Sequence, residues 1–180
     1  DKPHTPEYIS TIRLPYDYLP EATCPLWIKS IDEILQGDLN KTRTLQEFFG
    51  YCLSRDTRYE KAMFLVGEGG SGKSVILDCL QYILDPGNIS HISIKYFSDP
   101  AYMASIDGKL ANICSEVPKR GEDYEETFKR IVTGECIQVS PKFVPHYDIK
   151  PFAKLIFAIN QWPHIDDQTS AFYRRMLILP

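Results

Sequence analysis

The stretch from Phe64 to Leu84, FLVGEGGSGKSVILDCLQYIL, constrains the fold of this chain more than any other feature. A short apolar run enters the loop GEGGSGKS, which matches the pattern G-x-x-x-x-G-K-[ST] in full, and an amphipathic run follows. Glycines let such a loop wrap its backbone N–H groups inward, and the following helix points its positive end at the same space. The stretch therefore predicts a strand, a phosphate-binding loop and a helix, in that order.

The residue types of this loop predict how a nucleoside triphosphate is bound. We expect Lys73 to reach the β and γ phosphates and the Ser74 hydroxyl to ligate Mg²⁺, so the predicted ligands are ATP and Mg²⁺. A chance glycine-rich turn is the alternative, and the full motif between a strand and a helix disfavours it. The motif alone does not say what the triphosphate is used for. The residues predicted to bind the nucleotide are Gly67, Glu68, Gly69, Gly70, Ser71, Gly72, Lys73, Ser74 and Val75.

Short apolar runs alternate with amphipathic runs along most of the chain. This alternation predicts an α/β fold, with a mainly parallel sheet flanked by helices. We expect strands in AMFLV, NISHISI, KLANICS, AKLIFAIN and RRMLILP. We expect helices from Lys73, from Ser98 to Met103, and over DYEETFKRIVTG, where Gly134 closes the helix. The run IQVSPKFVPHYDIK predicts a β-hairpin inserted before the AKLIFAIN strand.

The first part of the chain predicts a short helical segment. It is rich in Pro and Tyr, with a strand signal near residues 9–14. We expect Thr23 to cap a helix that has Pro25 in its first turn, and a second helix from about Thr44. The predicted division is an N-terminal extension and helical segment over residues 1–57 and a P-loop ATPase core over residues 58–180. Because the sequence starts without Met and ends in a strand-like run, we expect it to be a fragment of a longer chain.

Composition disfavours several classes of protein. The formal net charge of −4 means that any nucleic-acid binding must come from a local basic feature. No apolar run approaches the roughly 20 residues that a membrane span needs, and the first residues lack the apolar core of a signal peptide. The five cysteines form no C-x-x-C pair, which disfavours disulfide scaffolds and structural zinc sites. We therefore expect reduced cysteines and a cytoplasmic protein.

Polar residues at two predicted strand ends suggest how the triphosphate is hydrolysed. Hydrolysis needs an acidic group near the metal and the attacking water, and Glu116 at the end of KLANICSEV supplies one. Ser115 stands where many P-loop ATPases carry a first acidic residue, so Glu116 either orients the water or also binds the metal. Asn160 ends AKLIFAIN and could hold the attacking water, although Asn also ends strands as ordinary turn chemistry. The order of these motifs and the gap of 44 residues (160 − 116) fit the AAA+ branch of P-loop ATPases.

Two arginines, Arg174 and Arg175, precede the last predicted strand. An arginine finger, often from a neighbouring subunit, commonly meets the charge that develops on the γ-phosphate. A pair of solvated arginines at a sheet edge is the alternative. The earlier motifs favour a finger role for one of the two.

Taken together, these motifs resemble the superfamily III helicase domain of phage and plasmid primase–helicase proteins, the group that includes the poxvirus-type primase–helicase. The matching stretches, from Leu45 onward, are LQEFFGYCLSRDTRYEKAMFLVGEGGSGKS, GKLANICSEV, ETFKRIVTGE, KPFAKLIFAIN and AFYRRMLILP. The resemblance implies that Glu116 closes the B motif, that Asn160 is the sensor of motif C, and that Arg175 matches the finger better than Arg174. It also implies a homo-hexameric ring that hydrolyses ATP at subunit interfaces, an upstream primase module, and the cytoplasm of a cell that hosts a phage, plasmid or virus.

The resemblance also makes the β-hairpin the part that moves single-stranded DNA. Lys142 and Phe143 lie at its tip, His146 on the return strand and Lys150 at its base. A basic residue beside an aromatic one suits contact with a phosphate and stacking on a base. An ordinary solvent-exposed turn is the alternative.

Two other functions use the same phosphate loop. A small-metabolite kinase would usually add a lid with several arginines, and the sequence shows no such segment. An assembly module that binds ATP without turnover gains weight from Ser115 at the first acidic position. DNA-stimulated ATPase activity and ring formation distinguish a helicase motor from both.

Overall fold

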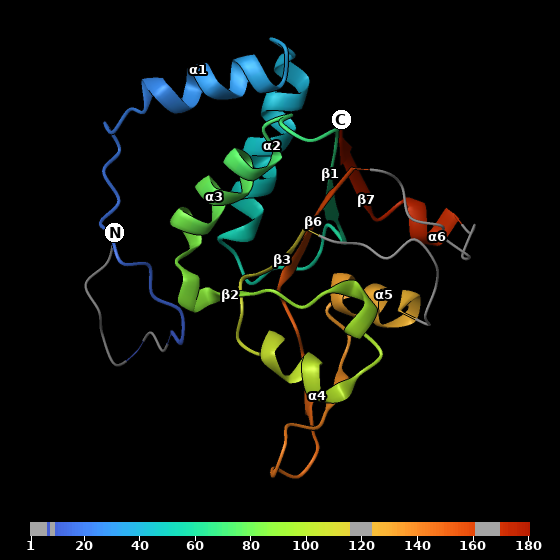
Figure 1. The fold of residues 1–180 in the computed structure, drawn as a ribbon. Coiled ribbons are helices and arrows are strands. Elements are labelled where there is room, and N and C mark those ends of the chain that lie inside the picture. Colours follow the sequence, from blue (N-terminus) through green and yellow to red (C-terminus); the bar gives the residue numbers. More distant parts are fainter. Residues whose placement is uncertain (1–6, 8–9, 116–123, 161–169) are drawn as a thin grey trace.

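A five-stranded parallel sheet forms the centre of the computed structural model, which describes residues 7, 10–115, 124–160 and 170–180 (Figure 1). Its strands lie in the order β2-β3-β6-β1-β7, and each neighbouring pair is parallel. The carboxyl ends of all five strands therefore meet at one edge, where an open α/β sheet binds its ligands. The strands are β1 (Ala62–Val66), β2 (Ile89–Ser90), β3 (Ala111–Cys114), β6 (Lys154–Ile159) and β7 (Met176–Leu179).

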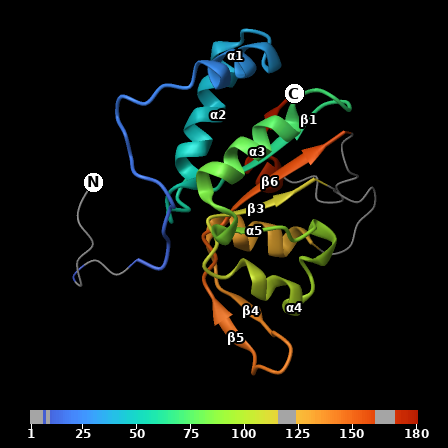
Figure 2. The same ribbon diagram turned by 60° about the vertical axis from the view of Figure 1, so that its left-hand side comes forward.

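Helices cover both faces of this sheet, which confirms the predicted fold class (Figures 1 and 2). Met63 and Leu65 of β1 pack with α1, α2 and α3, whereas Ala62 and Phe64 pack with α5 on the other face. This division follows from the strand geometry, because successive side chains point to opposite faces. No helix in the described part of the chain is both long enough and apolar enough to cross a membrane. The helices are α1 (Pro25–Ile34), α2 (Leu39–Cys52), α3 (Lys73–Leu84), α4 (Pro100–Met103), α5 (Glu125–Thr133) and α6 (Ser170–Tyr173), with 3-10 turns at Pro86–Asn88, Ile94–Tyr96 and Ala104–Ile106.

The predicted β-hairpin is confirmed. Its strands are β4 (Ile137–Val139) and β5 (Tyr147–Ile149), which pair antiparallel outside the main sheet. Ile137, Val139 and Ile149 bury their side chains in the core beneath α5, and the amide of Ser140 donates to the carbonyl of Pro100 at 3.0 Å. The hairpin base is thus anchored, while its tip projects from the molecule at the end opposite the loop between β1 and α3 (Figures 1 and 2).

The two N-terminal helices differ from the prediction in where they begin. Cys24, not Thr23, precedes the first helical residue Pro25, and no side chain caps this helix. The second helix begins at Leu39, five residues before the predicted Thr44. The reason is the carboxylate of Asp38, which accepts from the amides of Asn40 and Lys41 at 2.9 and 3.1 Å and so caps the helix. Both helices contribute side chains to the same core cluster as α3 and the sheet.

The predicted strand NISHISI is wrong over most of its length, since only Ile89 and Ser90 pair with β3. The side chain of Asn112 on β3 is fully buried, and it forms the hydrogen bonds to residue 92 that pairing between strand backbones would otherwise supply. Its oxygen accepts from the amide of Ile92 at 2.8 Å and its nitrogen donates to the carbonyl of the same residue at 3.0 Å. The chain then turns into the 3-10 helix that starts at Ile94.

The structure also tests three smaller predictions, of which two are wrong and one is confirmed. Asp99, not Ser98, caps the short helix α4, because its carboxylate accepts from the amide of Ala101 at 2.8 Å. The described part of the proposed first strand, residues 10–14, forms no strand. Gly134 closes α5 with a φ of +71°, as predicted.

Candidate nucleotide-binding site

The loop between β1 and α3 is wound tightly against its surroundings. The amide of Gly67 donates to the carbonyl of Ile159 at 3.1 Å, which fixes the start of the loop beside the end of β6. Gly72 precedes α3 with a φ of +89°, and a Cβ at this position would lie 2.5 Å from a side-chain carbon of Ile34 on α1. A Cβ at Gly67 would lie 2.7 Å from the hydroxyl of Ser71. The glycines therefore allow both a left-handed turn and a close approach that other residues would prevent.

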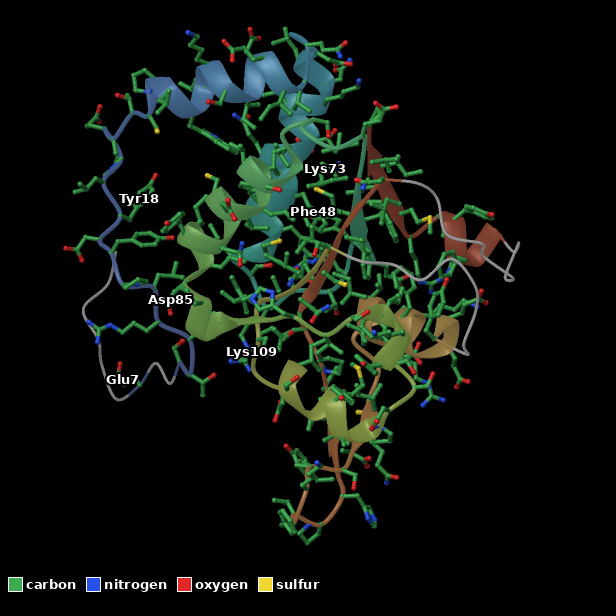
Figure 3. All side chains as sticks on the ribbon, viewed as in Figure 1. Glu7, Tyr18, Phe48, Lys73, Asp85 and Lys109 are labelled. Carbon is green, nitrogen blue, oxygen red and sulfur yellow. The ribbon has the colours of Figure 1, made fainter. Side chains whose placement is uncertain are left out.

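Lys73 is the first residue of α3 and lies at the end of this helix that meets the loop (Figure 3). The Nζ atom donates to the carbonyls of Gly67 and Glu68 at 2.5 and 2.9 Å and to the hydroxyl of Ser71 at 3.2 Å. Bonds from an ammonium to phosphate oxygens are charge-assisted and stronger than bonds to neutral carbonyls. A bound polyphosphate would therefore attract this group away from the loop carbonyls.

A cavity of about 390 Å³ lies over the loop at the carboxyl edge of the sheet. The pairing of Val66 with Ile159 and of Cys114 with Phe157 brings the ends of β1, β6 and β3 together at this cavity. The structure thus places Asn160, a predicted site residue, in the same cavity as Lys73 and Ser74. The residues that line it are Gly69, Gly70, Ser71, Gly72, Lys73, Ser74, Val75, Leu77, Ser115, Ala158 and Asn160.

These residues fit a triphosphate with its magnesium ion. The loop offers backbone N–H groups and an ammonium group to phosphate oxygens, and the hydroxyl of Ser74, which is exposed, is available to a cation. Among the described residues, no group of three His, Cys, Asp or Glu side chains could hold a metal on its own. The predicted partner of Ser74 in metal binding, Glu116, lies outside the described residues.

The two predicted finger residues lie at the opposite end of the sheet, just before β7. The carbonyl of Arg175 accepts from the amide of Ala62 at 2.8 Å, which places the pair at the amino end of β1. The five residues of β1 separate them from the phosphate loop by about 16 Å. Within one chain, the structure does not bring these arginines to the phosphate cavity.

The surroundings of the two arginines differ. The side chain of Arg174 is 64% exposed, whereas that of Arg175 is 9% exposed and lies 3.3 Å from the carboxylate of Glu60. Arg174 lies 4.0 Å from the same carboxylate, and its backbone carbonyl accepts a hydrogen bond from Lys61. Sequence reasoning missed Glu60, because an acidic residue two positions before a strand follows no recognisable pattern.

The predicted DNA-binding residues lie on the hairpin, at the end of the molecule opposite the loop between β1 and α3 (Figures 1 and 2). Lys142, Phe143, His146 and Lys150 are all exposed. Phe143 is completely exposed and has a φ of +64°, so its ring is presented at the turn without packing on the protein. An exposed aromatic ring next to a lysine can stack on a base while the lysine contacts a phosphate.

Residues 65–175, more than half of the chain, match the family described as "Family of unknown function (DUF5906)". A protein of Acanthamoeba polyphaga mimivirus, provisionally named helicase L207/L206, is 25% identical over 153 residues. The match covers 81% of this chain but 16% of the mimivirus protein, so it concerns a small part of that protein.

Two solved structures share the fold. The A form of the apo C-terminal region of NrS-1 matches with a TM-score of 0.66 at 20% identity over 94% of this chain. The JCV helicase matches with a TM-score of 0.55 at 11% identity over 84% of this chain. This chain spans 39% and 42% of those two chains, respectively. Sequence and fold thus relate this chain to proteins that are named as helicases.

Proposed function

The chain belongs to the family of unknown function DUF5906, and from that premise we propose that it is the ATPase motor of a DNA helicase. The proposal includes membership of helicase superfamily III and a role in the replication of a phage, plasmid or virus, in the cytoplasm of the host cell. The likeness to helicases of two viruses supports it.

The observation that carries the proposal is the phosphate cavity. It joins the ammonium of Lys73 and the hydroxyl of Ser74 with the side chain of Asn160 from a separate strand. A site for simple phosphate binding needs only the loop, whereas hydrolysis also needs a group that positions water opposite the γ-phosphate. A polar side chain at the end of the adjacent strand meets that need.

Each residue then has a task in transferring the γ-phosphoryl group from ATP to water, which yields ADP and phosphate. Lys73 and the loop amides hold the phosphates, while Asn160 orients the water and Glu116 accepts its proton. Ser74 and Glu116 would hold Mg²⁺, which neutralises charge on the phosphates when it is bound.

The arginines complete the site from a neighbouring subunit. Their separation from the phosphate loop of the same chain, about 16 Å along β1, supports a contact in trans. Because Arg174 exposes its side chain and Arg175 packs on Glu60, we assign the contact with the γ-phosphate to Arg174, although the sequence resemblance favours Arg175. Such an arrangement requires a neighbouring subunit. The resemblance implies that six subunits form a ring and that a primase module lies upstream.

The hairpin supplies the contact with single-stranded DNA. Lys142 and Phe143 at the tip, with His146 and Lys150 behind them, would follow the strand by phosphate and base contacts. In a ring, six such tips would gather positive charge that the net charge of one chain does not show.

ATPase activity of the full-length protein, measured with and without single-stranded DNA, tests this proposal. We expect DNA to stimulate turnover, and Lys73→Ala to abolish it by removing the charge that holds the phosphates. Normal turnover in Lys73→Ala would refute the site, and turnover that transfers phosphate to a metabolite without response to DNA would indicate a kinase.

A further inference from the structure

The loop of residues 54–61, which runs from the end of α2 to the start of β1, contacts two distant parts of the molecule. One part is the segment of Arg174 and Arg175 before β7, and the other is the base of the hairpin. Its hydrogen-bond partners lie 76 to 113 residues further along the chain, so no local pattern in the sequence indicated these contacts.

The end of this loop holds the two arginines. The carboxylate of Glu60 lies 3.3 Å from the guanidinium of Arg175 and 4.0 Å from that of Arg174. The ammonium group of Lys61 donates to the backbone carbonyl of Arg174. Glu60 has a φ of +49°, which is unfavourable for a residue with a side chain, so the surrounding contacts must keep it there. The position of Arg174 therefore depends on the conformation of this loop.

The middle of the loop contacts the chain that enters the hairpin. The hydroxyl of Thr57 donates to the carbonyl of Thr133, the last residue of α5, at 3.3 Å. A Cβ at Gly134 would lie 2.6 Å from the same hydroxyl, so the two segments pack closely just before β4. The amide of Glu60 donates to the carbonyl of Thr57 at 2.9 Å, which joins this contact to the residue that pairs with the arginines.

The beginning of the loop contacts the chain that leaves the hairpin. The guanidinium of Arg55 lies 4.5 Å from the centre of the ring of Phe152, between β5 and β6, in a cation–π contact. The ammonium group of Lys154, the first residue of β6, donates to the carbonyl of Ser54 at 2.5 Å. Both ends of the hairpin are therefore in contact with the loop that holds the arginines.

This loop also borders a cavity of about 850 Å³ between itself and α2. The walls of the cavity include Tyr59 and Lys61 of the loop and Glu47 and Phe48 of α2. An element that is packed closely on all sides can shift only if its neighbours shift as well. Because its α2 side faces a cavity, the loop can change position without a rearrangement of the core.

We propose that this loop couples the DNA contact of the hairpin to the arginine finger, with Arg55 and Thr57 as positioning residues, a coupling that rests on the proposed function above. DNA bound at the tip favours one position of the hairpin base, which favours one conformation of the loop through Arg55 and Thr57. That conformation sets where Arg174 meets the γ-phosphate in the neighbouring subunit. By linkage, a nucleotide at the interface changes the affinity for DNA by the same factor by which DNA changes the affinity for the nucleotide.

A double substitution in the full-length protein tests this coupling. Arg55→Ala with Thr57→Val removes the contact with Phe152 and the hydrogen bond to Thr133, and neither position is assigned a contact with nucleotide or DNA. We expect the factor by which single-stranded DNA stimulates kcat to fall about 3-fold or more, with kcat without DNA and KM for ATP unchanged. In fluorescence anisotropy, the Kd for a labelled oligonucleotide should lose its dependence on a non-hydrolysable ATP analogue.

A matched double substitution on α2 provides the control. Arg43 pairs with Glu47, and the hydroxyl of Thr44 donates to the carbonyl of Asn40, so both contacts lie within one helix. Arg43→Ala with Thr44→Val removes the same chemical groups and should leave the stimulation by DNA unchanged. Because Arg55 is exposed, Arg55→Ala alone should keep the fold and show a smaller loss of stimulation in the same direction.

Three outcomes would overturn the inference. If DNA stimulates the unmodified protein and the double variant in residues 55 and 57 equally, the coupling does not pass through this loop and the proposed function stands. If this variant loses turnover by the same factor with and without DNA, the loop has a structural role alone. If DNA does not stimulate the unmodified protein, the proposed function fails together with this inference.

Discussion

At the scale of single residues, Glu60 gives two adjacent arginines different roles. Its carboxylate lies 3.3 Å from the guanidinium of Arg175 and 4.0 Å from that of Arg174. Arg175 is largely buried, so its charge depends on this partner, whereas the exposed Arg174 is solvated without it. The backbone of Glu60 lies in the left-handed region, with a φ of +49°, and its amide donates to the carbonyl of Thr57 at 2.9 Å. We infer that Arg175 positions the segment and leaves Arg174 free to reach outward.

This difference predicts effects of different size on stability for two alanine substitutions. Arg175→Ala should lower the free energy of unfolding by about 1–3 kcal/mol, because it removes a buried, paired side chain. Arg174→Ala should change the free energy of unfolding by less than about 0.5 kcal/mol, as is usual for an exposed position. Urea unfolding of both variants checks this prediction, and equal losses would contradict the assignment.

A buried lysine far from the phosphate cavity makes stability depend on pH. The Nζ atom of Lys154 donates to the carbonyls of Ser54 and Phe152 at 2.5 and 2.9 Å and lies 4.5 Å from the centre of the Tyr51 ring. Burial lowers the pKa of Lys154 to about 8, and burial raises the pKa values of Tyr51 and Cys52 to about 12. The loop after α2 is thus joined to β6 through Lys154, whose positive charge is unfavourable in this buried position.

The sign of the pH dependence follows from these values. Between pH 8 and about 10.5 the unfolded chain keeps the Lys154 proton that the folded chain has lost, so stability rises with pH. Above about pH 9 the unfolded chain loses the Cys52 proton that the folded chain keeps, so Cys52 lowers the stability as pH rises. The effect of Lys154 on stability is therefore clearest between pH 8 and 9. We expect Lys154→Met to lack the rise in urea-unfolding free energy over this window. A rise of the same size in Lys154→Met would show that other groups cause it.

At the scale of elements, local signals in the sequence predicted the parts of the fold that local chemistry decides. The loop GEGGSGKS between a strand and a helix, the closure of α5 at Gly134 and the hairpin were all predicted correctly. The errors came from side chains that act across the fold or compete locally with the backbone. The side chain of Asn112 forms hydrogen bonds in place of the backbone pairing predicted for NISHISI. The carboxylate of Asp38 caps α2, so that this helix begins before the predicted residue. Asp38 is of a residue type that often caps helices, but the apolar spacing from Leu45 did not require a helix to begin so early. The bonds of Asn112 join positions 20 residues apart, so no local pattern indicated them.

The contact between α1 and the phosphate loop predicts a coupled pair of substitutions. Gly72→Ala should lower the free energy of unfolding by about 1–3 kcal/mol, because the residue has a φ of +89° and its Cβ would clash with Ile34. Gly69→Ala is the control for stability, since its Cβ would meet nothing within 4 Å. Thermal unfolding of Gly72→Ala combined with Ile34→Ala should show a smaller loss than the sum of the two. Strict additivity would mean that Gly72 and Ile34 are not in close contact.

The hairpin predicts an effect on DNA that is separate from stability. Phe143→Ala should leave the melting temperature unchanged, because the ring is completely exposed. It should weaken binding of single-stranded DNA about 5-fold or more, because base stacking on an aromatic side chain is lost. Tyr59, which is 63% exposed but lies away from the hairpin, provides the control Tyr59→Ala. Fluorescence anisotropy with a labelled oligonucleotide measures both, and equal binding by Phe143→Ala would exclude the stacking role.

At the scale of the whole molecule, the predicted site residues divide between the two ends of the sheet. Lys73, Ser74 and Asn160 meet at the carboxyl ends of the strands, whereas the two arginines precede β7 at the amino ends. The sequence indicated each motif but not this separation, because strand order and direction come from pairing over more than 100 residues. The separation is what makes a second subunit necessary to the proposed chemistry.

Mixing two inactive variants of the full-length protein tests this claim most directly. Lys73→Ala removes the phosphate contact of a subunit and Arg174→Ala removes the finger that the subunit offers to its neighbour. An interface between an intact phosphate loop and an intact Arg174 from different subunits should be active, so mixtures should regain ATPase activity that neither variant has alone. Absence of regain at every mixing ratio would contradict catalysis in trans, and regain with Arg175→Ala but not with Arg174→Ala would contradict the assignment of the finger.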